Sequence, residues 1–173
     1  MKGMRHAVAA TVIAVAACAL AVGATAGPRN DGNQFEATFE EVRIATHDRS
    51  ADLGILQAIN SGTGAVEGFG DATEILAVSQ DRSVSPCGPG SRSNATIRRI
   101  VVDAGTLVLQ GAGITCPTGT PGELLVTNTF VVDGASSTGV FVGARGSGTD
   151  TVLLPGRTVS LSGKLHLKRP AGN

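Results

Sequence analysis

The segment Thr158–Lys168 alternates apolar and polar side chains along its length, and this pattern constrains the fold more than any other in the chain. Its apolar positions are Val159, Leu161, Leu165 and Leu167. A period of two places one face of an extended strand against a core and the other face in water. No stretch after the first 26 residues shows a sustained helical period, so the sequence predicts an all-β domain.

Similar short runs, rich in β-branched residues, recur along the chain between clusters of Gly, Pro, Asp and Ser. We expect strands at Phe35–Thr46, Leu53–Asn60, Ala65–Phe69, Thr73–Ser79, Ala95–Val102, Thr106–Gly111, Glu123–Val132, Gly139–Arg145 and Thr158–Lys168. Breaks such as Asn60-Ser61-Gly62 and Asp133-Gly134 have the composition of hairpin turns. Eight or nine hairpin-connected strands favour an antiparallel barrel, because closure of the sheet removes its exposed edges.

The amino terminus has the pattern of a secretory signal peptide. Lys2 and Arg5 precede an apolar run over residues 7–22, which is short for a membrane span, and small residues follow up to Ala26. Cleavage near Ala26 delivers the mature chain to the periplasm or the exterior, with no stable membrane span. An alternative is lipoprotein processing, in which Cys18 becomes the lipidated first residue and anchors the protein.

This signal peptide, residues 1–26, is followed in our interpretation by one domain. We expect a flexible mature amino terminus over residues 27–34, a β-barrel domain over residues 35–168 and a C-terminal tail over residues 169–173. Lys2 and Arg5 are the only charged residues among the first 26, so the remainder has 12 basic and 14 acidic side chains, a formal charge of −2. This balance, with no Trp or Tyr in the chain, argues against a nucleic-acid partner.

Two cysteines remain after the signal peptide, Cys87 and Cys116, and both would reach an oxidising compartment. We therefore expect them to form one disulfide, the alternative being two independent buried thiols. The bridge would tie down the longest irregular segment, residues 80–94. The histidines His47 and His166 lie far apart, and no CxxC or HxxxH spacing occurs, so we expect neither a metal nor another cofactor.

The glycine-rich segment "GASSTGVFVGARGSGT", residues 134–149, contains glycines at positions where small barrels turn corners. It resembles the G-G-T-G-x-F-x-x-A-R/T-G-x-G segment of the allene oxide cyclase-like and dirigent-like barrels. The matching positions are Gly134, Thr138, Gly139, Phe141, Ala144, Arg145, Gly146 and Gly148, with Ser136 and Ser137 where the family more often has glycine.

This resemblance implies an eight-stranded antiparallel calycin-like barrel whose central cavity takes a small, mostly apolar molecule, often in a homo-oligomer. Members of the group cyclise reactive lipids, steer the coupling of phenolic radicals or close polyketide rings. We expect a secreted barrel that binds a small apolar molecule or has a structural role at the surface. The alternative is a cyclase-type or dirigent-type enzyme with isomerase-like activity. The segments around the catalytic acid of the plant cyclases have no match here, so the resemblance assigns no catalytic residue.

Phe141 and Arg145 are the candidate ligand-binding residues. They share strand parity, so an inward Phe141 predicts an inward Arg145 unless a bulge intervenes. A buried arginine needs an ionic partner or a wet cavity. The candidate partners are Glu36, Glu40, Glu41, Glu67 and Glu74. The alternative places Arg145 at a rim or bulge, in a surface ion pair that contributes little to stability.

Overall fold

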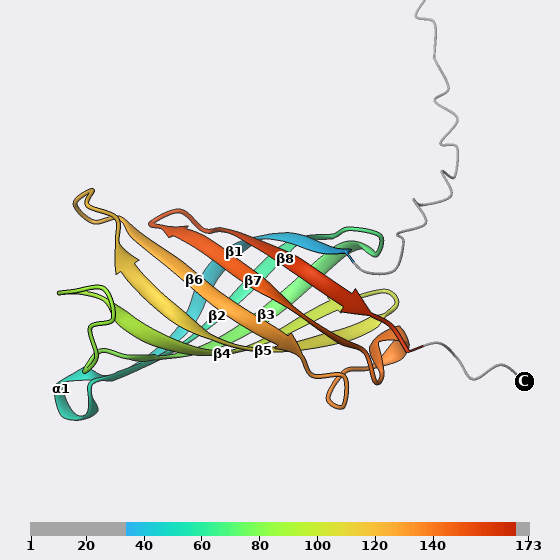
Figure 1. The fold of residues 1–173 in the computed structure, drawn as a ribbon, viewed down its shortest axis with the longest axis horizontal. Coiled ribbons are helices and arrows are strands. Elements are labelled where there is room, and N and C mark those ends of the chain that lie inside the picture. The colour runs from blue at the N-terminus through green and yellow to red at the C-terminus, as the bar shows by residue number, and fades with distance from the viewer. Residues whose placement is uncertain (1–33, 169–173) are drawn as a thin grey trace, which may run out of the picture.

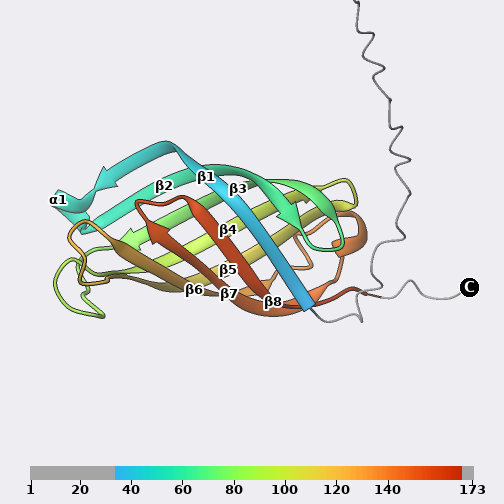
Figure 2. The same cartoon turned by 90° about the horizontal axis from the view of Figure 1, so that it is seen from above.

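The computed structural model describes residues 34–168, which form one closed antiparallel barrel of eight strands in chain order (Figures 1 and 2). The strands are β1 (Gln34–Arg49), β2 (Ile55–Val66), β3 (Gly70–Asp81), β4 (Arg92–Val102), β5 (Gly105–Pro117), β6 (Leu124–Val132), β7 (Arg145–Leu154) and β8 (Thr158–His166). A short helix, α1 (Ser50–Leu53), joins β1 to β2, and a 3₁₀ turn, η1 (Gly139–Phe141), precedes β7. The predicted all-β antiparallel barrel is confirmed.

The predicted signal peptide, the alternative lipidation at Cys18 and the C-terminal tail lie outside residues 34–168. Within that range, no helix has the length and apolar character needed to cross a membrane.

One half of the barrel interior is a solid apolar core. It contains Phe35, Ala37, Phe39, Val66, Ala72, Ile100, Val102, Leu107, Leu109, Phe130, Phe141, Ala144, Val159, Leu161 and Leu165. Phe141 comes from the segment between β6 and β7, which folds over this end of the barrel, and its ring packs on Phe69 with the centroids 5.0 Å apart. We call this the closed end; α1 and the loop between β3 and β4 lie at the opposite, open end (Figure 1).

Glycines inside the barrel make room for large side chains on neighbouring strands. Gly148 of β7 pairs with Phe130 of β6, and a Cβ atom at Gly148 would lie 2.5 Å from the tip of that ring. Gly62 of β2 pairs with Glu74 of β3, and a Cβ atom there would lie 2.7 Å from a carboxyl oxygen of Glu74. A narrow barrel thus accommodates Phe130 and Glu74 because the residue opposite has no side chain.

One predicted turn and one predicted strand are wrong. Asn60-Ser61-Gly62 is not a turn, because β2 runs unbroken through it with Gly62 facing inward. Residues 139–145 are not a strand: Gly139 and Gly143 have φ values of 60° and 71°, which extended strands do not use, and β7 begins only at Arg145. Of the glycines expected at strand corners, Gly139 and Gly143 therefore lie in a turn, whereas Gly148 lies within β7.

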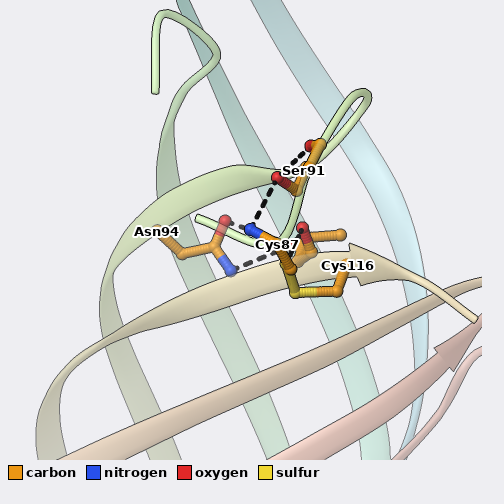
Figure 3. Close-up of a disulfide and its surroundings, with 6 residues drawn as sticks. Cys87, Ser91, Asn94 and Cys116 are labelled. Carbon is orange, nitrogen blue, oxygen red and sulfur yellow. Dashed lines mark hydrogen bonds between the residues drawn. A yellow bond between two sulfur atoms is a disulfide. The ribbon is translucent and has the colours of Figure 1, made fainter. Parts of the chain in front are cut away.

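The predicted disulfide is present between Cys87 and Cys116, with the Cα atoms 5.9 Å apart (Figure 3). It ties the loop between β3 and β4 to the end of β5. Ser91 closes the same loop, since its hydroxyl accepts a hydrogen bond from the Cys87 backbone N–H (3.1 Å) and donates one to the Gly88 carbonyl oxygen (2.6 Å). A disulfide of this kind is compatible with a location outside the cytoplasm.

Candidate functional site

The half of the barrel interior that lies nearer the open end contains a buried arginine surrounded by carboxyl groups. Arg98 of β4 is only 3% exposed. Its Nη1 donates hydrogen bonds to Glu41 Oε1 (2.9 Å) and to Glu74 Oε2, and its Nη2 lies 3.7 Å from Asp150 Oδ2. Strands β1, β3 and β7 therefore each direct one carboxyl group at the same guanidinium. We call these four residues the acid–arginine cluster.

Ionisation of all three carboxyl groups around one cation would be energetically unfavourable in a site shielded from water. Burial raises the pKa of Glu74 from 4.5 to about 8; the positive charge of Arg98 opposes this shift, and the negative charge of Glu41 adds to it. Burial likewise raises the pKa of Asp150, against the effects of Arg98 and of a hydrogen bond from Asn128. Glu74 consequently keeps its proton at neutral pH, and its contact with Arg98 is a hydrogen bond to a neutral carboxyl group.

A chain of buried amides extends the cluster towards the disulfide. Asn128 Nδ2 donates to Asp150 Oδ1 (2.6 Å), and Asn94 Nδ2 donates to Asn128 Oδ1 (3.2 Å) and to Thr115 Oγ1 (3.0 Å). Gln80 Nε2 in turn donates to Asn94 Oδ1 (3.3 Å). Asn94 lies close to the disulfide at the open end (Figure 3). Because each amide orients the next, the network holds Asp150 in a defined position.

A small cavity of about 60 Å³ lies beside this network. Its walls combine polar groups, including Glu41, Arg98 and Asp150, with aliphatic side chains such as Val126 and Val152. A water molecule needs roughly 10–15 Å³ of such space, so the cavity alone accommodates only a few waters.

A depression of about 280 Å³ opens between β1, β2 and the turn that joins β7 to β8, and we call it the outer depression. It shares five lining residues with the inner cavity: Glu41, Arg43, Asn60, Val152 and Leu154. The two spaces therefore lie on either side of a shared wall. The outer depression by itself, at about 280 Å³, lies close to the lower end of the range of about 300–1,000 Å³ that is typical of small-molecule sites.

A larger depression, of about 630 Å³, lies on the outer face of β1–β5. Its walls include small and aliphatic side chains such as Ala77, Ala95 and Ile97, without the convergent charged groups of the open end. Specific small-molecule sites combine apolar walls with a few converging polar groups. We therefore place the candidate site at the open end of the barrel.

The two candidate ligand-binding residues lie away from this site. Phe141 is buried at the closed end and lines neither the cavity nor the depression at the open end. Arg145 is exposed at the start of β7 and lies beside a separate surface depression with His166 and Lys168. Their part in ligand binding stays a prediction.

Glu41 and Glu74 were among the carboxylates expected to pair with a buried arginine, and they do pair with one. That arginine is Arg98 rather than Arg145. The sequence contained a signal for this, because Arg98 has the same parity as Ile100 and Val102 in an alternating run. Within residues 34–168, no three His, Cys, Asp or Glu side chains are arranged to hold a metal ion.

Comparisons of the chain with protein-family models, with curated proteins and with solved structures find no match. The class of protein therefore rests on the geometry. It is a closed eight-stranded antiparallel barrel, compatible with a calycin-like fold, with an acid–arginine cluster beneath its open end.

Proposed function

We propose that this barrel is a secreted protein that binds a small, mostly apolar molecule at its open end. The observation that carries the proposal is that the outer depression and the inner cavity share five lining residues, so the polar network lies directly behind the wall of the depression. Aliphatic side chains such as Val152 and Leu154 would contact the apolar body of the ligand, and the polar network would orient a polar group.

The resemblance to allene oxide cyclase-like and dirigent-like barrels supports this proposal at the level of architecture. The number and antiparallel order of the strands fit the resemblance. Its glycine-rich motif lies at the closed end, where it supports the fold rather than the proposed site. The apolar amino-terminal run and the disulfide support export from the cytoplasm.

An isomerase-type or cyclase-type enzyme is the second candidate, and Asp150 is the observation that favours it. This carboxyl group lines the inner cavity, is 4% exposed and has a raised pKa because of its burial. A buried carboxyl group with a raised pKa is suited to general acid–base catalysis. Glu74 does not line the cavity, but its carboxyl group contacts Arg98 and would hold a second proton within the cluster.

Native mass spectrometry of the mature protein from its own host tests the binding proposal. We expect the wild-type protein to carry a co-purifying small molecule. A Val152→Phe variant should lose the bound molecule, because the larger ring would occupy the space beside Val152 in which the ligand is expected to lie. A Leu153→Phe variant is the matched control, since Leu153 is the next residue and is 48% exposed. Wild-type protein with no bound mass, or equal retention by the two variants, contradicts the proposal and leaves a structural role at the surface.

A further inference from the structure

Three arginines without acidic partners surround the open end. Arg43 of β1 and Arg157 of the turn between β7 and β8 are both exposed and line the outer depression. Arg92 begins β4 and has the same strand parity as the inward Asn94. None of the three forms an ion pair among residues 34–168, whereas Arg82 nearby lies 3.7 Å from Asp48.

Arg92 is unusual among these because it is half-buried and its Nε–H has no hydrogen-bond partner in the described part of the chain. Burial lowers the pKa of this guanidinium, and the positive charges of Arg82 and Arg43 lower it further. Arg43 and Arg92 therefore lie within each other's electrostatic field. A buried donor without a partner and a group of like charges are both costly, and both would be relieved by an anion.

The carboxyl groups below cannot provide that anion. Glu41 separates the arginines from the interior, and its two oxygens already accept hydrogen bonds from Arg98 (2.9 Å) and from Asn60 (2.8 Å). The outer depression is thus lined by two arginines without acidic partners and by one carboxyl group, Glu41, whose oxygens are already engaged. An anionic group of a ligand would be attracted to the two arginines and repelled by Glu41.

We infer that the ligand is a small organic anion, whose negatively charged oxygen group binds Arg43 and Arg157 at the outer depression while its short apolar body contacts the aliphatic wall formed by Val152 and Leu154. Arg92 lines neither space, and its positive charge adds to the field at Arg43. This inference rests on the proposed binding function and adds the chemical class of the ligand. Guanidinium groups favour such ligands because they donate paired, charge-assisted hydrogen bonds to planar oxyanions. The volume of about 280 Å³ restricts the apolar body to one or two rings or a short chain.

The test compares two fluorescent probes with the same apolar body, 2-naphthoate and the neutral 2-naphthalenemethanol. The chain contains no Trp and no Tyr, so protein emission does not mask the naphthalene signal. We titrate the mature protein into each probe and follow fluorescence anisotropy at low and high salt. The expected result is that naphthoate binds at least about ten-fold more tightly than the alcohol, and that added salt reduces this preference.

Substitutions then locate the preference. Arg43→Gln and Arg157→Gln should each reduce the affinity for naphthoate and leave that for the alcohol unchanged. Arg99→Gln is the matched control, because Arg99 carries the same charge on the exposed outer face of β4. Melting temperatures from circular dichroism show that each variant is folded.

The outcomes separate the two proposals. Equal affinity for both probes, tighter binding of the alcohol, or a naphthoate preference that survives both arginine substitutions overturns the inference while the binding function stands. Failure of both probes to bind overturns the inference together with the binding function on which it depends.

Discussion

A substitution of Glu74 by glutamine should change how the stability of the barrel depends on pH. Burial raises the pKa of Glu74 from 4.5 to about 8 in the folded protein, whereas the unfolded chain exposes the carboxyl group to water. Between these two values the folded state keeps a proton that the unfolded state has released. The contribution of Glu74 to stability is therefore fully present below about pH 4.5 and is lost as the pH rises through about 8.

The size of the effect follows from linkage. One proton bound only in the folded state changes the free energy of unfolding by about 1.4 kcal/mol per pH unit. Between pH 5.5 and 7.5, the wild-type protein should lose about 2–3 kcal/mol through Glu74. The Glu74→Gln variant lacks this loss, because its neutral amide resembles the protonated carboxyl group in size and cannot ionise. Asp150 is present in both proteins, so the difference between their pH profiles isolates Glu74.

Urea unfolding followed by far-ultraviolet circular dichroism provides the measurement, since the chain has no Trp or Tyr for a fluorescence assay. Free energies of unfolding are determined for both proteins at pH 5.5, 6.5 and 7.5. Glu67→Gln is the control, because Glu67 is an exposed carboxylate in the turn between β2 and β3. Parallel profiles for the wild-type and Glu74→Gln proteins would refute the reasoning, because they would mean that Glu74 is already ionised throughout this range.

Other predictions concern packing and the disulfide. Gly62→Ala should destabilise the barrel by about 1–3 kcal/mol, because the new methyl group would lie 2.7 Å from the carboxyl group of Glu74; an unchanged urea midpoint would contradict this. Phe141→Ala should cost about 3–5 kcal/mol, since its ring is 1% exposed at the closed end; a wild-type melting temperature would show that the ring does not stabilise the core. Reduction of the bridge between Cys87 and Cys116 should lower stability by roughly 3.5 kcal/mol, given their sequence separation of 29; two titratable thiols in the native protein would exclude the bridge.

The parts of the fold that sequence predicts well are those set by neighbouring residues. Alternation in β8 correctly identifies Val159, Leu161 and Leu165 as buried. The same pattern fails at Leu167, which is 41% exposed because it lies just beyond the end of the strand. Cysteine number and the expected compartment were likewise enough to predict the disulfide.

Glycine was harder to interpret, because the barrel uses it for two different purposes. Gly139 lies in a turn with a positive φ, whereas Gly62 and Gly148 lie in strands opposite large side chains. The sequence does not distinguish these roles, since which residue lies opposite depends on strand register. For this reason one predicted turn, Asn60-Ser61-Gly62, proved to be strand, and one predicted strand proved to be a turn.

The acid–arginine cluster depends on register even more strongly. Arg98 meets Glu74 and Glu41, which lie 24 and 57 residues away in sequence, through the pairing of four successive strands. The sequence identified both carboxylates as candidate partners but associated them with Arg145, which belongs to a different strand. Parity within β4 indicates that Arg98 faces inward, and only closure of the barrel determines which acids surround it.

The pairing of an inward glycine with a large residue has a consequence for how this barrel can vary. A methyl group at position 148 would lie 2.5 Å from the tip of the Phe130 ring and 2.2 Å from the Ser162 carbonyl oxygen of β8, so a smaller residue at position 130 would not by itself make room for it. We therefore expect glycine to stay fixed at position 148 among relatives, while the size of the residue at position 130 can vary. This difference gives an engineer a means of hollowing out the barrel, because Phe130→Leu with Gly148 kept would extend the lumen towards the closed end.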